Sequence, residues 1–261
     1  MKLGFIGAGN IGSAIITGIS TCSTPPEKIL VFDPDIKKCE ALEQRFEQVE
    51  ALSSNQEVLN NADCVFLCVL PQIAPQVLLP LDFRNEHLVV SVIAVRSISE
   101  IKEYVSPALE VIRAVPLPPI AKHSGPLIYY PVHDKISELF SGTAHAIPVT
   151  REEDLIVLSA ITGLIAPYYS LVHSIALWAA NCGVDEKVAT EYSLAMFEAQ
   201  SLQAIENNLE LKELIEEVAT PGGLNEQALR YVNNQNGLEP FLGALDILLQ
   251  RLGLDVPERF A

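Results

Sequence analysis

The sequence predicts an α/β fold, in which a parallel sheet with crossover helices is followed by an all-helical unit. A glycine-rich turn lies between a short apolar run and a helical stretch at the N-terminus. Short β-rich runs alternate with helical stretches up to about residue 150, and beyond that point the β-rich runs stop. We therefore expect two domains, residues 1–150 with the sheet and residues 151–261 with helices alone.

The glycine turn follows a strand expected at Leu3–Ile6 and opens a helix expected at Ile11–Ile19. In this context the G-x-G-x-x-G spacing is typical of a Rossmann-type dinucleotide-binding domain, although glycines can open any buried helix. Gly7 permits the tight turn, Gly9 lets the backbone approach a pyrophosphate, and Gly12 lets the helix pack close to the strand. Free N–H groups at the helix start would bind the phosphates. The expected cofactor-binding residues here are Gly7, Gly9, Asn10, Ile11 and Gly12.

An acidic residue supports the same interpretation. The run Lys28–Phe32 is expected as the next strand and ends in Asp33, about 20 residues beyond the last glycine, where a ribose-binding acid is expected. A carboxylate accepts hydrogen bonds from a ribose 2′-OH and repels a 2′-phosphate, so Asp33 favours NAD(H) over NADP(H). Lys37 and Lys38, one turn further on, would favour a phosphate and leave NADP(H) open.

The remaining elements follow from the alternation of β-rich and helical runs. Further strands are expected at Cys64–Val69, Leu88–Val92, Val111–Ala114 and Leu127–Tyr130. Helices are expected at Ile36–Arg45, Asn55–Asn61, Ile73–Leu79 and Ser99–Tyr104, the last with Ser97 and Glu100 in a capping box. The C-terminal part predicts helices over Glu152–Cys182 with a break near Gly163 and Pro167, and over Asp185–Asn207, Asn225–Val232 and Leu238–Leu252. These helices are apolar on more than one side, which predicts a homodimer or higher homo-oligomer.

The bulk composition limits the classes of partner. A net charge of −16 argues against nucleic acid and anionic membrane surfaces. No uninterrupted apolar segment reaches the roughly 18–20 residues of a membrane span, and five glycines from Gly4 to Gly18 weaken a signal helix. The five scattered cysteines predict no metal site, and Cys64 and Cys68 are expected to be small hydrophobic residues of a strand. We expect a cytoplasmic protein with a small-molecule substrate.

Four further stretches carry a resemblance that covers nearly the whole chain. They are Val69–Gln72, Ser91–Val95 with Ser99–Ile101, Val111–Pro119, and Thr220–Gly223 with Phe241–Leu245. With the glycine turn, the chain resembles the pyrroline-5-carboxylate reductase family. The resemblance implies a Rossmann domain, an all-helical dimerisation domain, and NAD(P)H-dependent reduction of a cyclic imine to proline. It also implies that the active site forms where one subunit's nicotinamide pocket meets the other subunit's Pro-Gly-Gly turn.

The resemblance implies further site residues. The cofactor-binding set gains Val69, Leu70, Pro71 and Ala94, and the substrate-binding set is Pro116, Gly222, Gly223 and Leu224. The N–H groups of Gly222 and Gly223 could hold a carboxylate at the start of a helix, although Pro-Gly-Gly is also an ordinary turn. Thr220 and Asn225 are the expected catalytic residues, with a turn residue and a helix cap as their alternatives. His123 is the best candidate for a proton donor or, alternatively, a surface-loop residue, and Lys122 beside it could attract an anionic substrate.

The chain departs from the family at four positions on the nicotinamide and substrate side. The family has Lys at Leu70, Asn at Leu117, and two Thr residues at Leu224 and Asn225. Hydrogen bonds to charged groups are worth ~1.5–3 kcal/mol each, so the substrate could differ from pyrroline-5-carboxylate. A dehydrogenase of another small acid stays open. Such an enzyme usually needs a Lys or His base at the start of the helical domain, and His173 is the one candidate there. A non-catalytic nucleotide-binding protein also stays open, because Leu70 and Leu117 stand where the family has polar residues.

Overall fold

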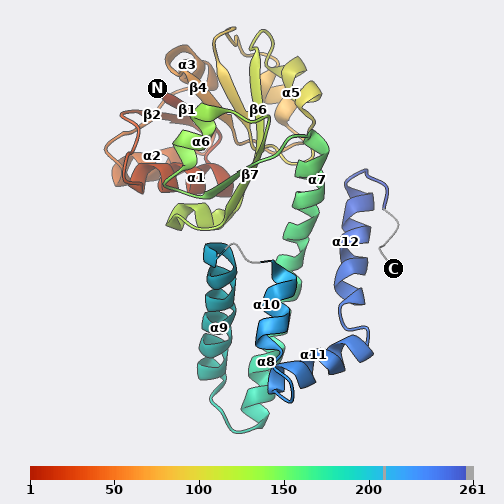
Figure 1. The fold of residues 1–261 in the computed structure, drawn as a ribbon. Helices are drawn as coiled ribbons and strands as arrows, with labels where there is room; N and C mark the ends of the chain where they lie inside the picture. Colours follow the sequence, from red (N-terminus) through yellow and green to blue (C-terminus); the bar gives the residue numbers. More distant parts are fainter. Residues whose placement is uncertain (208–209, 257–261) are drawn as a thin grey trace. The chain divides into compact units, whose positions relative to one another are not determined.

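The computed structural model describes residues 1–207 and 210–256. The chain divides into two compact units, Met1–Leu158 and Ser159–Ala261 (Figure 1). The first unit contains a twisted sheet with helices on both faces, and the second unit is helical in its described residues.

The sheet of the first unit has eight strands in the order β3-β2-β1-β4-β5-β6-β7-β8. The strands are β1 (Leu3–Ile6), β2 (Ile29–Phe32), β3 (Val49–Ala51), β4 (Cys64–Leu67), β5 (Leu88–Ser91), β6 (Glu110–Pro116), β7 (Pro126–Tyr130) and β8 (His145–Pro148). Strands β1 to β6 are parallel, β7 pairs with β6 in the antiparallel sense, and β8 runs parallel to β7. The expected α/β fold with a predominantly parallel sheet is therefore confirmed, and an antiparallel pair extends one edge.

Helices cover both faces of the sheet because successive strand residues point to opposite sides. The helices are α1 (Asn10–Thr21), α2 (Ile36–Arg45), α3 (Asn55–Asn61), α4 (Ala74–Leu78), α5 (Ile98–Tyr104), a 3₁₀ turn (Pro118–Lys122), α6 (Asp134–Phe140) and α7 (Glu152–Ile161). Leu3 and Phe5 belong to the hydrophobic core under α1, α2 and α6, whereas Ile6 belongs to the core under α3, α4 and α5 (Figure 1). Phe5 also stacks on Phe66 of the neighbouring strand, with ring centroids 4.6 Å apart.

All the strands and helices expected up to Tyr130 are present, with ends that differ by a few residues. The capping box of Ser97 and Glu100 is confirmed at the start of α5. The sequence pattern missed β3, β8 and α6. The two strands have only three and four residues, and β8 carries a histidine and a proline, so neither shows a β-rich run. Helix α6 has only seven residues, which is too short for a clear helical period.

The second unit continues with helices throughout its described residues. They are a 3₁₀ turn (Thr162–Leu164), α8 (Ile165–Asn181), α9 (Glu186–Asn207), α10 (Leu211–Val218), α11 (Leu224–Asn234) and α12 (Glu239–Arg251). The predicted break near Gly163 is this 3₁₀ turn, where an added Cβ would lie 2.2 Å from Leu248 of α12. Pro167 lies in the first turn of α8, where proline is tolerated. Helices α8 and α9 pack together, with Tyr168 against Phe197.

The expectation that no apolar segment reaches the length of a membrane span is wrong for one helical stretch. Residues Glu152–Asn181 form 30 helical residues that are long and apolar enough to cross a membrane by length and composition alone. The expectation failed because the 3₁₀ turn joins α7 and α8 instead of separating them. Only 17% of the most apolar window of this stretch is buried within the chain. A helix that packs against a second subunit also presents an exposed apolar surface of this kind.

Candidate functional site

The carboxyl ends of β1, β2, β4 and β5 meet at one edge of the sheet. Strand β1 has β2 on one side and β4 on the other, so the chain order reverses at β1. In open α/β sheets, ligands bind outside the carboxyl ends of the strands at such a switch point. We refer to this edge as the carboxyl edge.

The glycine turn lies at the carboxyl edge, and each glycine has a different steric reason. Gly7 has φ +102°, and an added Cβ would lie 2.7 Å from the carbonyl oxygen of Cys68. An added Cβ on Gly12 would lie 2.5 Å from the carbonyl oxygen of Gly7. Gly9 has φ −68°, and an added Cβ would meet no atom of the chain within 4 Å. The fold therefore requires Gly7 and Gly12, whereas Gly9 leaves open space in front of the turn.

Asp33 follows β2 and is bonded to the glycine turn. Its Oδ2 accepts a hydrogen bond of 2.8 Å from the backbone N–H of Ala8, and its Oδ1 accepts one of 2.9 Å from the backbone N–H of Asp35. Lys38 Nζ lies 3.7 Å from Asp33 Oδ1 and 3.7 Å from Asp35 Oδ2. A carboxylate has about four lone-pair sites, so Asp33 can still accept a hydrogen bond from a ribose hydroxyl. Lys38 is already shared by two carboxylates, which leaves it less able to bind a 2′-phosphate.

These residues fit a dinucleotide. The turn exposes the N–H groups at the start of α1, which have no partner within a helix. The open space at Gly9 would leave room for a pyrophosphate, and Asp33 places a carboxylate, directly after the neighbouring strand, where a ribose hydroxyl could donate to it. Asn10 is exposed and Ile11 is half-buried at the first two positions of α1.

The loops after β4 and β5 reach the same edge. Val69 and Pro71 are half-buried, whereas Leu70 has 67% of its surface exposed. Ala94 is exposed in the loop after β5. The next residue, Val95, has φ +57°, which is a left-handed conformation that β-branched residues rarely adopt. The structure therefore brings all the expected cofactor-binding residues to one edge.

Two residues were expected near the substrate. Pro116 is covered by its own sheet, and His123 lies away from the carboxyl edge. Pro116 is buried as the last residue of β6, where it pairs with Leu127 of β7. His123 Nε2 lies 2.9 Å from Thr21 Oγ1 and 3.1 Å from the carbonyl oxygen of Gly18, at the C-terminal end of α1. The 12 residues of α1 put this point about 18 Å from the glycine turn, at about 1.5 Å per residue. His123 therefore closes a helix end, which corrects its choice as proton donor and favours its alternative role as a surface-loop residue.

The Pro-Gly-Gly turn lies in the second unit and opens α11. Its N-cap is Gly223, whose N–H donates to the carbonyl oxygen of Thr220 at 2.9 Å. The N–H of Gly222 donates to Glu226 Oε2 at 2.8 Å, so a substrate carboxylate at Gly222 would replace that of Glu226. Asn225 lies one residue inside the helix, so it is not the cap that the sequence left as its alternative role. Thr220, Leu224 and Asn225 are all exposed.

The cysteines and other metal-binding residues give no second site in the described ranges. Burial raises the pKa of the Cys64 thiol to about 12 and raises the pKa of the Cys68 thiol further. Both thiols therefore stay neutral, as expected for small hydrophobic residues. No group of three or more His, Cys, Asp or Glu side chains could hold a metal ion within residues 1–207 and 210–256.

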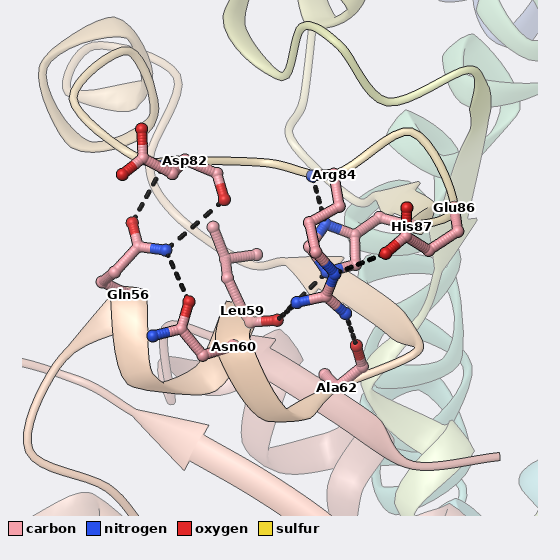
Figure 2. A network of polar contacts seen from close by, with 8 residues as sticks. All are labelled: Gln56, Leu59, Asn60, Ala62, Asp82, Arg84, Glu86 and His87. Carbon is pink, nitrogen blue, oxygen red and sulfur yellow. Dashed lines mark hydrogen bonds and ion pairs between the residues drawn. The ribbon is translucent and has the colours of Figure 1, made fainter.

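A dense polar network lies at the opposite edge of the sheet (Figure 2). Arg84 donates to the carbonyl oxygens of Leu59 and Ala62 at 2.6 and 3.0 Å, in the last turn of α3 and just beyond it. His87 is fully buried and contacts the same carbonyl of Leu59 through Nε2 at 3.0 Å. Ala62 and His87 lie just before β4 and β5, so the network lies at the amino ends of the strands. Its role is to close α3.

The fold and the carboxyl edge define a dinucleotide-binding oxidoreductase with an appended helical unit. Residues 2–95 match the family model described as "NADP oxidoreductase coenzyme F420-dependent", and residues 152–248 match "Pyrroline-5-carboxylate reductase dimerisation". A pyrroline-5-carboxylate reductase of Vibrio alginolyticus is 30% identical over 244 residues, which cover 89% of each chain. The chain belongs to the pyrroline-5-carboxylate reductase family.

Solved structures agree on the fold. A pyrroline-5-carboxylate reductase of Coxiella burnetii is similar with a TM-score of 0.85 and 22% identity, over 96% of this chain and 97% of that one. The pyrroline carboxylate reductase of Plasmodium falciparum, solved with NADP bound, has a TM-score of 0.78 and 21% identity, over 97% of each chain.

The sequence interpretation missed Arg96, which contacts the loop after β4 and the first turn of α5. A signal was present, because Arg96 and Glu100 are four residues apart at the start of a helix and can form an ion pair.

Proposed function

We propose that this chain is an NAD(P)H-dependent reductase of a cyclic imine of the pyrroline-5-carboxylate type. The observation that carries the proposal is the glycine turn at the switch point, with open space at Gly9 and Asp33 bonded to Ala8. The relative of Vibrio alginolyticus supports the substrate class. When bound, the nicotinamide supplies the hydride that the carbon of a C=N bond accepts.

The role of the protein itself is to bind and orient the cofactor and the substrate. Gly7 and Gly12 hold the turn, so that the N–H groups of Asn10 and Ile11 would be free to bind the pyrophosphate. The loops with Val69 to Pro71 and Ala94 would hold the nicotinamide half of the cofactor. Rate acceleration then comes mainly from proximity and from fixed dipoles rather than from a side-chain nucleophile.

The turn at residues 220–225 is the substrate-binding segment of this proposal. The N–H of Gly222 would hold a substrate carboxylate in place of that of Glu226, beside the helix cap Gly223, and Leu224 would contribute apolar contact. Thr220 and Asn225 would be the polar partners of the imine nitrogen. Support comes from the resemblance of this turn to its family counterpart and from its place at the N-terminus of α11.

The second unit is proposed to form the contact between subunits of a homodimer or larger homo-oligomer. Large apolar side chains of α8, α9 and α11 are exposed, among them Leu177, Trp178, Val188, Tyr192 and Tyr231. The matched dimerisation model covers these helices. Sedimentation velocity of the purified chain tests this, and a monomer at micromolar concentration would contradict it.

All five cysteines are free, which fits a reducing, cytoplasmic compartment.

The first prediction concerns turnover. The purified chain with NADH and pyrroline-5-carboxylate is expected to oxidise NADH and to form proline, measured by absorbance at the nicotinamide band and by chromatography of the product. Small hydroxyacids with NAD⁺ serve as the comparison and are expected to give no reduction. Turnover of a hydroxyacid would favour the dehydrogenase alternative, and NADH binding without turnover of any substrate would favour a non-catalytic nucleotide-binding protein.

The second prediction concerns the choice of cofactor, for which we propose NAD(H). NADH is expected to bind more tightly than NADPH by about tenfold, because a single unfavourable charge contact of ~1.4 kcal/mol gives that ratio. Fluorescence titration with both cofactors measures it. Asp33→Asn keeps an oxygen for the N–H of Ala8 and is expected to remove most of the difference.

Asp35→Asn is the matched control for this titration. It removes the same charge two residues away, from an exposed side chain. If it changes the ratio of the two affinities as much as Asp33→Asn does, net charge rather than the ribose contact sets the preference. Equal affinities in the unmodified chain would contradict the choice of NAD(H).

A further inference from the structure

Arg96 joins two loops of the carboxyl edge. Its Nη2 donates to the carbonyl oxygen of Pro71 at 3.0 Å, in the loop after β4. Its Nη1 donates to Glu100 Oε1 at 2.9 Å, in the first turn of α5. The guanidinium therefore spans from the loop after β4 to the helix that follows β5. A rigid group with several donors can make such a bridge, whereas a lysine amine cannot reproduce its fork.

The anchor at Glu100 is itself held by several hydrogen bonds. Its Oε2 accepts from the N–H and the hydroxyl of Ser97 at 2.9 and 3.0 Å, and its own N–H donates to the Ser97 hydroxyl at 3.2 Å. These bonds, first that from the Ser97 N–H and then that from Arg96, hold the pKa of the Glu100 carboxyl below its ordinary value of 4.5. Glu100 is therefore ionised at neutral pH and gives Arg96 a fixed partner.

The residue directly before Arg96 is strained. Val95 adopts φ +57°, a conformation that costs roughly 1–2 kcal/mol for residues with a Cβ. Its side chain is 63% exposed, so buried contacts do not account for the conformation. Strained residues persist where the surrounding structure holds them in place, and they cluster at ligand sites. The bonds of Arg96 and Ser97 are the restraints that follow Val95 directly in the chain.

We propose that Arg96 is a positioning residue, which holds the loops with Leu70–Pro71 and Ala94–Val95 in the arrangement that receives the nicotinamide half of the cofactor. This inference rests on the proposed function, because it takes the carboxyl edge as the cofactor site. Arg96 acts through Pro71 and Val95, while the glycine turn and Asp33 bind the other half of the dinucleotide independently. The loss of Arg96 should therefore weaken the binding of a ligand that has the nicotinamide half, and leave the binding of a ligand that lacks it nearly unchanged.

The experiment compares NADH with ADP-ribose, which lacks the nicotinamide. Arg96→Gln is expected to weaken NADH binding by about tenfold, as the loss of one hydrogen bond to a charged group implies, and ADP-ribose binding by less than about twofold. Arg96→Lys keeps the charge and the pairing with Glu100 and is expected to weaken NADH binding to a similar extent. Unchanged ADP-ribose affinity also shows that the variant is folded. Equal losses for both ligands, or no loss for either, would overturn the proposal.

Two further variants sharpen the test. Lys102→Gln removes a positive charge from an exposed position of the same helix and is expected to leave both affinities unchanged. Val95→Gly relieves the strain, so Arg96→Gln is expected to weaken NADH binding less in the Val95→Gly background. The same loss in both backgrounds would contradict the coupling of Arg96 to Val95.

Failure of this inference is distinguishable from failure of the proposed function. An unmodified chain that binds NADH but reduces no imine would overturn the proposed function. The comparison of NADH with ADP-ribose binding would still test the role of Arg96. An unmodified chain that binds no NADH would overturn both.

Discussion

Gly9→Ala is expected to weaken NADH binding by about tenfold or more and to leave the thermal midpoint of unfolding nearly unchanged. An alanine methyl at this position meets no atom of the chain within 4 Å, and φ −68° suits alanine. The same methyl would occupy the space that a pyrophosphate needs in front of the turn. A displacement that breaks one hydrogen bond between the backbone and a charged phosphate, worth ~1.5–3 kcal/mol, gives a loss of this size. Fluorescence titration and calorimetry measure the two quantities.

Gly12→Ala is the matched comparison, because it adds the same methyl three residues later. Its Cβ would lie 2.5 Å from the carbonyl oxygen of Gly7 and 3.1 Å from Cys68 Cβ. Backbone atoms cannot move aside as the end of a flexible side chain can, so this variant is expected to lose about 1–3 kcal/mol of unfolding free energy. Gly9→Ala should therefore lower the affinity for NADH without lowering the stability, whereas Gly12→Ala should lower both. Equal destabilisation by the two variants would show that Gly9 is needed by the fold and not by a ligand.

The glycine turn and the position of Asp33 at the carboxyl edge could be predicted from the sequence because their determinants are local. The spacing of Gly7, Gly9 and Gly12 reports backbone conformation and close packing, and both depend on a few neighbouring residues. Asp33 stands at a fixed distance along the chain because one helix and one strand separate it from the turn. The structure adds a contact that spacing cannot predict, the hydrogen bond between Asp33 and the N–H of Ala8.

Other features depend on distant parts of the chain and left no local signal. A strand was expected at Leu127–Tyr130, but its antiparallel direction was not, because an apolar run has the same pattern in either direction. The burial of Pro116 follows from its pairing with Leu127 in that strand. His123 was a candidate proton donor because it lies close to Pro116 in sequence. The chain turns back over α1 between them, and the histidine bonds to the end of that helix.

The substrate side remains the least predictable part. The Thr220–Asn225 turn was identified through the resemblance to the family. The same resemblance implies that the residues facing this turn belong to a second subunit. Local rules described the turn itself well, since Gly222 has φ +75° and Gly223 is the N-cap of α11. They did not predict that Glu226 would accept the N–H of Gly222, because a side chain at that helix position can equally extend into solvent.

The stability of the first unit is expected to depend strongly on His87, which lies in the network of Figure 2. Its Nδ1 accepts the backbone N–H of Arg84 at 3.0 Å, so the ring proton is on Nε2 and is donated to the carbonyl oxygen of Leu59 at 3.0 Å. Burial, followed by the charge of Arg84, lowers the pKa of His87 below its ordinary value of 6.5. His87→Leu removes both hydrogen bonds and leaves the N–H of Arg84 without its acceptor. It is expected to lose about 2–4 kcal/mol of unfolding free energy at pH 8.

The same geometry predicts the sign of a pH dependence. Protonation would place a second ring proton on Nδ1, directly against the N–H of Arg84. As pH falls below 6.5, the unfolded chain binds this proton before the folded chain does, so the contribution of His87 is complete above 6.5 and is lost below it. Denaturant unfolding from pH 8 to pH 5 should show a smaller fall in stability for His87→Leu than for the unmodified chain. His145→Leu, at an exposed position of β8, is the control and is expected to change stability by less than about 0.5 kcal/mol. Identical pH profiles for His87→Leu and the unmodified chain would show that His87 does not exclude its second proton.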